Sequence, residues 1–135
     1  MTKVAKIKLT TALFCEDVRR EDNGKLILIG MFGRNIGVPS FPASIGIQCA
    51  LIIEVEKPGP SKLEFEIRFN GEPKGKGRGV AEHVETGRAI LSTPFLMIGE
   101  IEESGTLSLA VAEEGQEFRE IASIPIDGPP MQNDG

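Results

Sequence analysis

The cysteines and the single histidine are the residues of this chain that could perform nucleophilic chemistry. Cys15 as nucleophile and His83 as its base would be the parts of an acyl-transfer enzyme. Reactive thiolates lie in electropositive, partly exposed places, whereas Cys15 lies in an apolar, strand-like run. We therefore interpret Cys15 and Cys49 as free, buried core residues. We expect the protein not to be an enzyme, although paired acids distant in sequence would leave no signature.

A cluster of carboxylates offers a second kind of chemistry, the binding of a cation. Its members are Glu16, Asp17, Glu21 and Asp22. Calcium takes several carboxylate oxygens, but the spaced Asp-x-Asp-x-Asp-Gly pattern of a calcium loop is missing. One histidine and two separated cysteines also lack the spacing of a zinc site. We expect no metal and no other cofactor, and interpret the cluster as a solvated hairpin tip, with calcium as the alternative.

Two further stretches carry residues suited to recognition. The sequence "GKGRG" at residues 75–79 combines backbone N–H groups with two cations, but it lacks the Gly-Lys-Ser/Thr ending of a phosphate loop. We interpret it as a flexible connector. Phe41 lies in "GVPSFPAS", where flanking prolines stiffen the loop. We interpret its ring as a plug at one end of the fold and retain Phe41 as a candidate partner contact.

The carboxylate cluster and Cys15 belong to a predicted hairpin over residues 14–32. Asn23-Gly24 is the strongest short-range hairpin signal, because both residues tolerate the positive φ of a two-residue type I′ turn. This turn places Val18 opposite Ile29 and Cys15 opposite Phe32. The apolar run "KLILIGMF" that follows predicts a strand covered on both faces.

Alternating apolar residues predict further strands along the chain. Residues 47–69 read as a second hairpin around "KPGPS", and residues 104–126 read as a third, with a turn at Glu114-Gly115 and a bulge in the return strand. Pro94 indicates an edge or a bend. The sequence therefore predicts an all-β fold, an antiparallel β-sandwich of about seven to eight strands, immunoglobulin-like or C2-like. We expect one domain over residues 1–126 and a flexible tail over 127–135.

Composition restricts the class of protein. The net charge of −5 argues against a nucleic-acid surface, which needs a clustered excess of Lys and Arg. No apolar stretch approaches the roughly 20 residues of a membrane span. Since no cleavable leader is recognisable either, we expect a cytoplasmic protein without a transmembrane segment.

The block "ALFCEDVRREDNGKLILIGMF", followed by "VPSFP", resembles a family of small uncharacterised bacterial proteins, a domain of unknown function. Members of that family open with a similar Cys-acid-Asp-Val-Arg segment, then Asn-Gly-Lys, then an apolar strand that ends in Ile-Gly. The resemblance implies no activity, cofactor or catalytic residue.

Strand edges suggest how such a domain could act. Natural sheets protect their edges with lysine, proline and bulges, and Lys3, Lys6 and Lys8 predict one protected edge. The run 107–112 has neither lysine nor proline, so we expect it to be available for pairing, with Ser108 and Ala110 as candidate partner contacts. The predicted function is a non-enzymatic interaction module that binds a protein partner or itself as a homo-oligomer. The alternative is a domain that binds a small ligand or, with calcium, a membrane surface.

Overall fold

The chain folds into strands joined by short turns, and the computed structural model describes residues 4–129. No helix occurs among these residues. The strands are β1 (Lys6–Cys15), β2 (Asp17–Arg20), β3 (Leu26–Ile29), β4 (Ile36–Gly37), β5 (Ala43–Lys57), β6 (Gly59–Phe69), β7 (Glu72–His83), β8 (Gly87–Ser92), β9 (Leu96–Ile101), β10 (Gly105–Glu113) and β11 (Arg119–Asp127).

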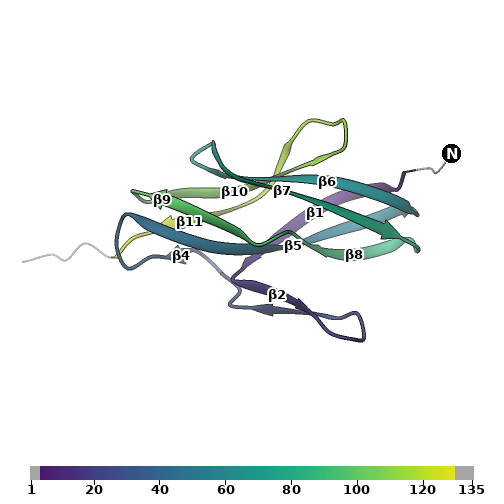
Figure 1. The fold of residues 1–135 in the computed structure, drawn as a ribbon, viewed down its shortest axis with the longest axis horizontal. Coiled ribbons are helices and arrows are strands. Elements are labelled where there is room, and N and C mark those ends of the chain that lie inside the picture. Colours follow the sequence, from purple (N-terminus) through teal and green to yellow (C-terminus); the bar gives the residue numbers. More distant parts are fainter. Residues whose placement is uncertain (1–3, 130–135) are drawn as a thin grey trace, which may run out of the picture.

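Two sheets pack face to face, and a two-stranded ribbon stands off one of them (Figure 1). In the first sheet β5 pairs with β1 on one side and with β8 and β9 on the other. The second sheet has the order β4-β11-β10-β6-β7, and only its short β4–β11 pair is parallel. The predicted antiparallel all-β sandwich is confirmed, with more strands than the seven or eight expected.

The core lies between the two sheets and follows the alternation in the sequence. On β5, Ile47, Leu51 and Ile53 are all fully buried, because every second side chain of a strand points to the same face. On the facing sheet Phe65 and Ile67 of β6 do the same. The alternation therefore predicted correctly which residues form the core.

The connection between β5 and β6 is not the predicted hairpin. The two strands belong to different sheets, and the chain crosses from one to the other at Pro58. Residues 59–61 of the predicted turn already lie in β6, where Gly59 pairs with His83. Alternation shows which face of a strand is buried but not which strand lies beside it, and so the pattern fitted either arrangement.

The true hairpin partner of β6 is β7, which contains the stretch interpreted as a flexible connector. Asn70 and Gly71 have φ of 50° and 84°, as a type I′ turn requires, and residues 72–83 return along β6. Two glycines of this strand lie close to other side chains: a Cβ on Gly79 would lie 3.1 Å from the Phe65 ring, and one on Gly77 would lie 3.2 Å from Pro94. The connector prediction for residues 75–79 is therefore wrong.

The third predicted hairpin is confirmed as β10–β11. The partners change from Leu109↔Ala122 to Ala110↔Glu120, which leaves one extra residue in the return strand, the predicted bulge. β11 extends to Asp127, whose carbonyl accepts a hydrogen bond from the Val38 N–H at 2.9 Å. Asp127, which was assigned to the tail, thus belongs to β11, and residues 130–135 of the predicted tail lie outside the described part of the chain.

The predicted bend at Pro94 is confirmed. It separates β8 from β9, and both of these strands pair with β5. At the bend the Thr93 hydroxyl accepts a hydrogen bond from the Cys49 N–H at 2.9 Å. Within residues 4–129 no helix is long and apolar enough to span a bilayer.

Candidate functional site: the β2–β3 ribbon

The ribbon, defined here as residues 17–29, is the predicted first hairpin with a different register. Val18 pairs with Leu28, not Ile29, because the loop has three residues instead of two. The Glu21 N–H donates to the Lys25 carbonyl, the Gly24 N–H donates to the Glu21 carbonyl, and Gly24 has φ of 86°. This is a type I turn followed by a left-handed glycine, the usual three-residue hairpin loop.

Cys15 is not part of the ribbon and does not face Phe32. It ends β1 and pairs with Gln48 of β5. The predicted contact is wrong by one residue, because the Phe32 N–H donates to the carbonyl of Phe14, the neighbour of Cys15, at 2.9 Å.

The side chain of Gln48 ties the ribbon to the sandwich. Gln48 of β5 accepts the Val18 N–H through Oε1 at 2.9 Å and donates through Nε2 to the Thr93 carbonyl, also at 2.9 Å. Figure 1 shows the ribbon on the far side of the first sheet from the second sheet. β2 is consequently the strand held to the sandwich.

The outer face of the ribbon is apolar and exposed. Ile27 and Ile29 are 42% and 37% exposed, and Met31 beyond β3 is 55% exposed. The prediction that this strand is covered on both faces is therefore wrong. An apolar run does not show whether the second face is buried within the chain or left open.

The outer edge of β3 has unpaired backbone groups. In an antiparallel ladder hydrogen-bonded and non-hydrogen-bonded pairs alternate. Since the Val18 N–H points to Gln48, the Val18–Leu28 pair is non-hydrogen-bonded, and the backbone N–H and C=O of Leu28 point away from β2. The same holds for Leu26, two residues earlier. Neither residue bonds outside its own sheet within residues 4–129.

The outer strands of the sandwich differ from β3 because they carry features that oppose pairing. Lys6 and Lys8 lie on β1, as predicted, and the Arg119 guanidinium donates to the Leu9 carbonyl at 3.3 Å beside a groove of about 630 Å³. Lys3 lies outside the described residues. Pro125 interrupts the donors of β11, which pairs with β4 only at Ile126 and Asp127.

The opposite side of the sandwich is protected in the same way. Lys74, Lys76 and Arg78 are exposed along β7, and Arg88 lies on β8. β9 runs against β7. Pro94, which precedes β9, also lies close to β7, since a Cβ on Gly77 would be 3.2 Å from it.

The predicted edge on β10 is not an edge. β10 lies between β6 and β11, and both Ser108 and Ala110 are buried. The premise for their role as partner contacts is wrong, because the sequence of one strand does not show its place in the sheet. Phe41 is half-buried and packs against the core, as expected for a plug.

Both cysteines are free and buried, as predicted. Burial raises the pKa of the Cys49 thiol to about 12, with a smaller contribution from the neighbouring Cys15 and an opposing one from the hydrogen bond with Thr93. Burial also raises the pKa of Cys15, whose S–H donates to the Gln48 carbonyl at 3.1 Å. Raised pKa values disfavour the thiolate that a nucleophile needs.

His83 pairs with a serine instead of a cysteine. The Ser61 hydroxyl lies 2.8 Å from His83 Nε2, because the β6–β7 register brings the two residues together. A nucleophile and its base meet at this distance, but both residues are buried, and Ser61 lines a cavity of only about 220 Å³. Sequence reasoning missed this pair because no local spacing signals it.

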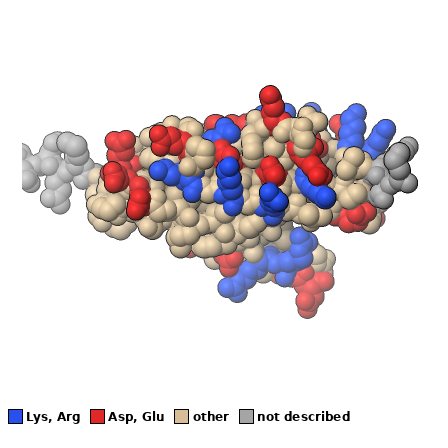
Figure 2. All heavy atoms as spheres, turned by 45° about the horizontal axis from the view of Figure 1, so that its top comes forward, with Lys and Arg blue, Asp and Glu red and all other residues tan. Residues whose placement is uncertain are grey.

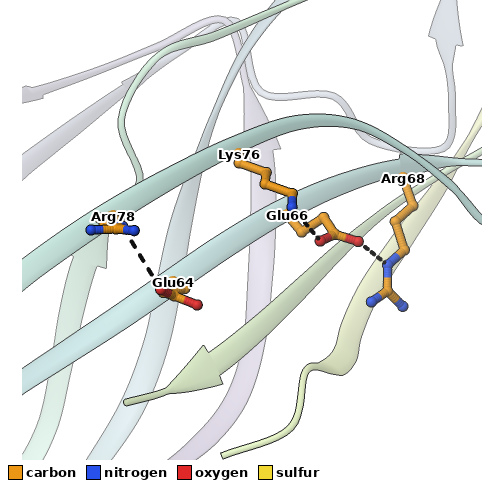
Figure 3. Close-up of polar contacts among 5 residues, drawn as sticks. All are labelled: Glu64, Glu66, Arg68, Lys76 and Arg78. Carbon is orange, nitrogen blue, oxygen red and sulfur yellow. Dashed lines mark hydrogen bonds and ion pairs between the residues drawn. The ribbon is translucent and has the colours of Figure 1, made fainter. Parts of the chain in front are cut away.

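The charges of β6 and β7 form ion pairs with each other. Figure 3 shows the Glu66 carboxylate between Arg68 and Lys76, at 2.8 Å and 4.0 Å, and Arg78 beside Glu64 at 3.7 Å. In Figure 2 acidic and basic side chains are interspersed on this face. These cations are thus partly neutralised, which weakens the interpretation of "GKGRG" as an anion site.

The carboxylate cluster is dispersed along the ribbon and Glu16, the residue that precedes it. Asp17 pairs with Arg19 at 3.1 Å, whereas Glu21 and Asp22 lie at the other end, in and beside the loop. Within residues 4–129 no three His, Cys, Asp or Glu side chains come together in a way that could hold a metal ion.

Comparison with known proteins bears on the resemblance noted in the sequence. No curated protein matches the chain. Residues 10–122 match the model of a family of unknown function, DUF6941, and the chain belongs to that family.

Proposed function

We propose that this protein is a non-enzymatic interaction module whose ribbon binds a protein partner by strand pairing at β3. The observation that carries the proposal is the outer edge of β3, where Leu26 and Leu28 direct unpaired backbone groups outward beside the exposed side chains of Ile27 and Ile29. An extended peptide that adds to an open edge gains main-chain hydrogen bonds from such groups, and side-chain contacts add specificity.

The architecture of the ribbon supports this role. A two-stranded hairpin has marginal stability in water on its own, and here each strand has only four residues. Apart from Gln48, the contacts of the ribbon with the sandwich are few. A further strand on β3 would cover Ile27 and Ile29 in part and complete a three-stranded sheet.

The chemistry elsewhere in the molecule fits a binding role better than catalysis. The two thiols have raised pKa values, and the Ser61–His83 pair is buried. We also propose that the protein acts in the bacterial cytoplasm, a reducing compartment in which the unpaired Cys15 and Cys49 remain thiols.

Site-specific photo-crosslinking in cells that produce the protein natively tests this function. A photoreactive amino acid at Ile29 should give covalent adducts with protein, because this side chain lies beside the proposed pairing edge. The same amino acid at Val80, which is exposed on β7, is the matched control and should give few adducts. Equal adduct formation at both positions, or none at Ile29, would contradict the proposal.

A further inference from the structure

Resting on the proposed function, we infer that the partner of β3 is β3 of a second copy of this chain, in an antiparallel pair about a two-fold axis that passes beside Ile27. The two ribbons would then form one four-stranded sheet. Contacts of this kind are isologous, with the same surface on both copies.

The backbone geometry of β3 is self-complementary. Leu26 and Leu28 both direct N–H and C=O outward, and in an antiparallel pair centred on Ile27 each Leu26 faces Leu28 of the other copy. Facing residues with outward backbone groups exchange two hydrogen bonds. The two Ile27 residues then form the intervening non-hydrogen-bonded pair, in which side chains approach most closely.

Charge also favours a second copy in this orientation. The chain has a net charge of −5, so two copies meet most readily at a surface without net negative charge. Residues 26–29 are uncharged, and in the rest of the ribbon the three carboxylates are balanced by Arg19, Arg20 and Lys25. Antiparallel pairing also places Glu21 and Asp22 of the two copies at opposite ends of the new sheet, whereas parallel pairing would bring them together.

Position in the fold leaves β3 free for this contact. Gln48 holds β2 against the sandwich, which leaves β3 as the outer strand of the ribbon. The contact involves short strands, so we expect a weak dimer that forms at micromolar concentration.

Opposite substitutions at Ile27 test the two-fold pairing. Because Ile27 faces itself across the axis, Ile27→Lys and Ile27→Glu each place two like charges side by side and should weaken dimerisation at least about tenfold. Mixing the two variants pairs Lys with Glu and should restore a dimer in sedimentation velocity experiments. Val80→Lys, an exposed change on β7, is the control and should dimerise like the unmodified chain.

The possible results separate this inference from the proposed function. A chain that stays monomeric up to high micromolar concentration overturns self-pairing, as does a mixture of the Lys and Glu variants that fails to dimerise. If crosslinking at Ile29 still gives adducts with a different protein, the proposed function stands and only the identity of the partner is wrong. Concentration-dependent dimerisation with recovery in the mixture supports self-pairing.

Discussion

The outer strands β1, β7 and β8 of the sandwich carry lysine or arginine, and β9 runs against β7, whereas β3, the outer strand of the ribbon, carries no charge and no proline. β7 carries Lys74, Lys76 and Arg78 along its length, and β3 reads Leu-Ile-Leu-Ile. Edges that remain exposed to water are protected against pairing with other chains. The difference supports the proposal that the ribbon, and not the sandwich, makes the contact with a partner.

The two regions also differ in what holds them together. The sandwich buries a continuous core that includes Leu51 and Phe65, and the ribbon contributes no fully buried side chain of its own. Stability should therefore depend on the sandwich, and association should depend on the ribbon. Substitutions in one region should leave the property of the other unchanged.

The largest expected effect is on the free energy of unfolding, from a change in the core. Leu51→Ala should cost about 2–5 kcal/mol, because it leaves a cavity at a fully buried position. Ile27→Ala in the ribbon should cost less than about 1 kcal/mol, since that side chain is 42% exposed. Urea unfolding of both variants measures the contrast. Similar losses would show that the ribbon is part of the stabilising core.

A smaller effect on the free energy of unfolding is expected from a change at Gln48, which links the ribbon to the sandwich. Gln48→Leu removes the acceptor of the Val18 N–H and the donor to the Thr93 carbonyl, and should cost about 1–3 kcal/mol. Gln116→Leu, in the exposed turn after β10, is the control. The Val18 amide should exchange faster with solvent in the Gln48 variant. Unchanged exchange at Val18 would mean that Gln48 does not hold the ribbon.

A change in the ribbon loop should have an effect of about 1 kcal/mol. Gly24 has φ of 86°, a conformation that costs other residues roughly 1–2 kcal/mol, so Gly24→Ala should lower the melting temperature. Gly33→Ala is the control, because a Cβ there meets open space and φ is not in the left-handed region. Equal melting temperatures for the two variants would contradict the three-residue loop.

The smallest effect on the free energy of unfolding near neutral pH is expected from the ionisation of the Cys49 thiol. Its pKa is raised from 9.0 to about 12 by burial, so the folded state holds this proton more tightly than the unfolded state. The resulting stability is fully present below about pH 9 and is lost as the pH rises from there towards 12. Between pH 9 and 12 the free energy of unfolding should fall more steeply with pH for the unmodified chain than for the Cys49→Ala variant. Equal pH dependence of the two variants would show that the thiol ionises as easily in the folded state as in the unfolded state.

The sequence predicted the individual strands better than it predicted which strands lie side by side. Alternation identified the buried positions of β5 and β6, yet the chain crosses between sheets at Pro58 where a hairpin was expected. The glycines of β7 indicated a loop, because the residues that lie close to Gly77 and Gly79, Pro94 and Phe65, come from other parts of the chain. Such pairings depend on tertiary contacts that no local pattern contains.

The candidate site was predictable only in part for the same reason. Asn23-Gly24 correctly indicated a turn, and one additional loop residue shifted the register, so that Val18 faces Leu28. The expected open edge was assigned to β10, which is central, because the order of strands in a sheet cannot be read from one strand. The open edge of β3 follows from the hydrogen bond of Gln48 with Val18 on the other side of the ribbon, and no local pattern in the sequence indicates that bond.

Amide hydrogen exchange in the ribbon, measured at low and at high protein concentration, tests the central claim most directly. In a single copy the Leu26 and Leu28 N–H groups point to solvent and should exchange rapidly, whereas Ile27 and Ile29 are bonded to β2. At high concentration the exchange of Leu26 and Leu28 should slow, because both amides become bonded to the second copy. Rapid exchange of these two amides at every concentration would contradict pairing at β3.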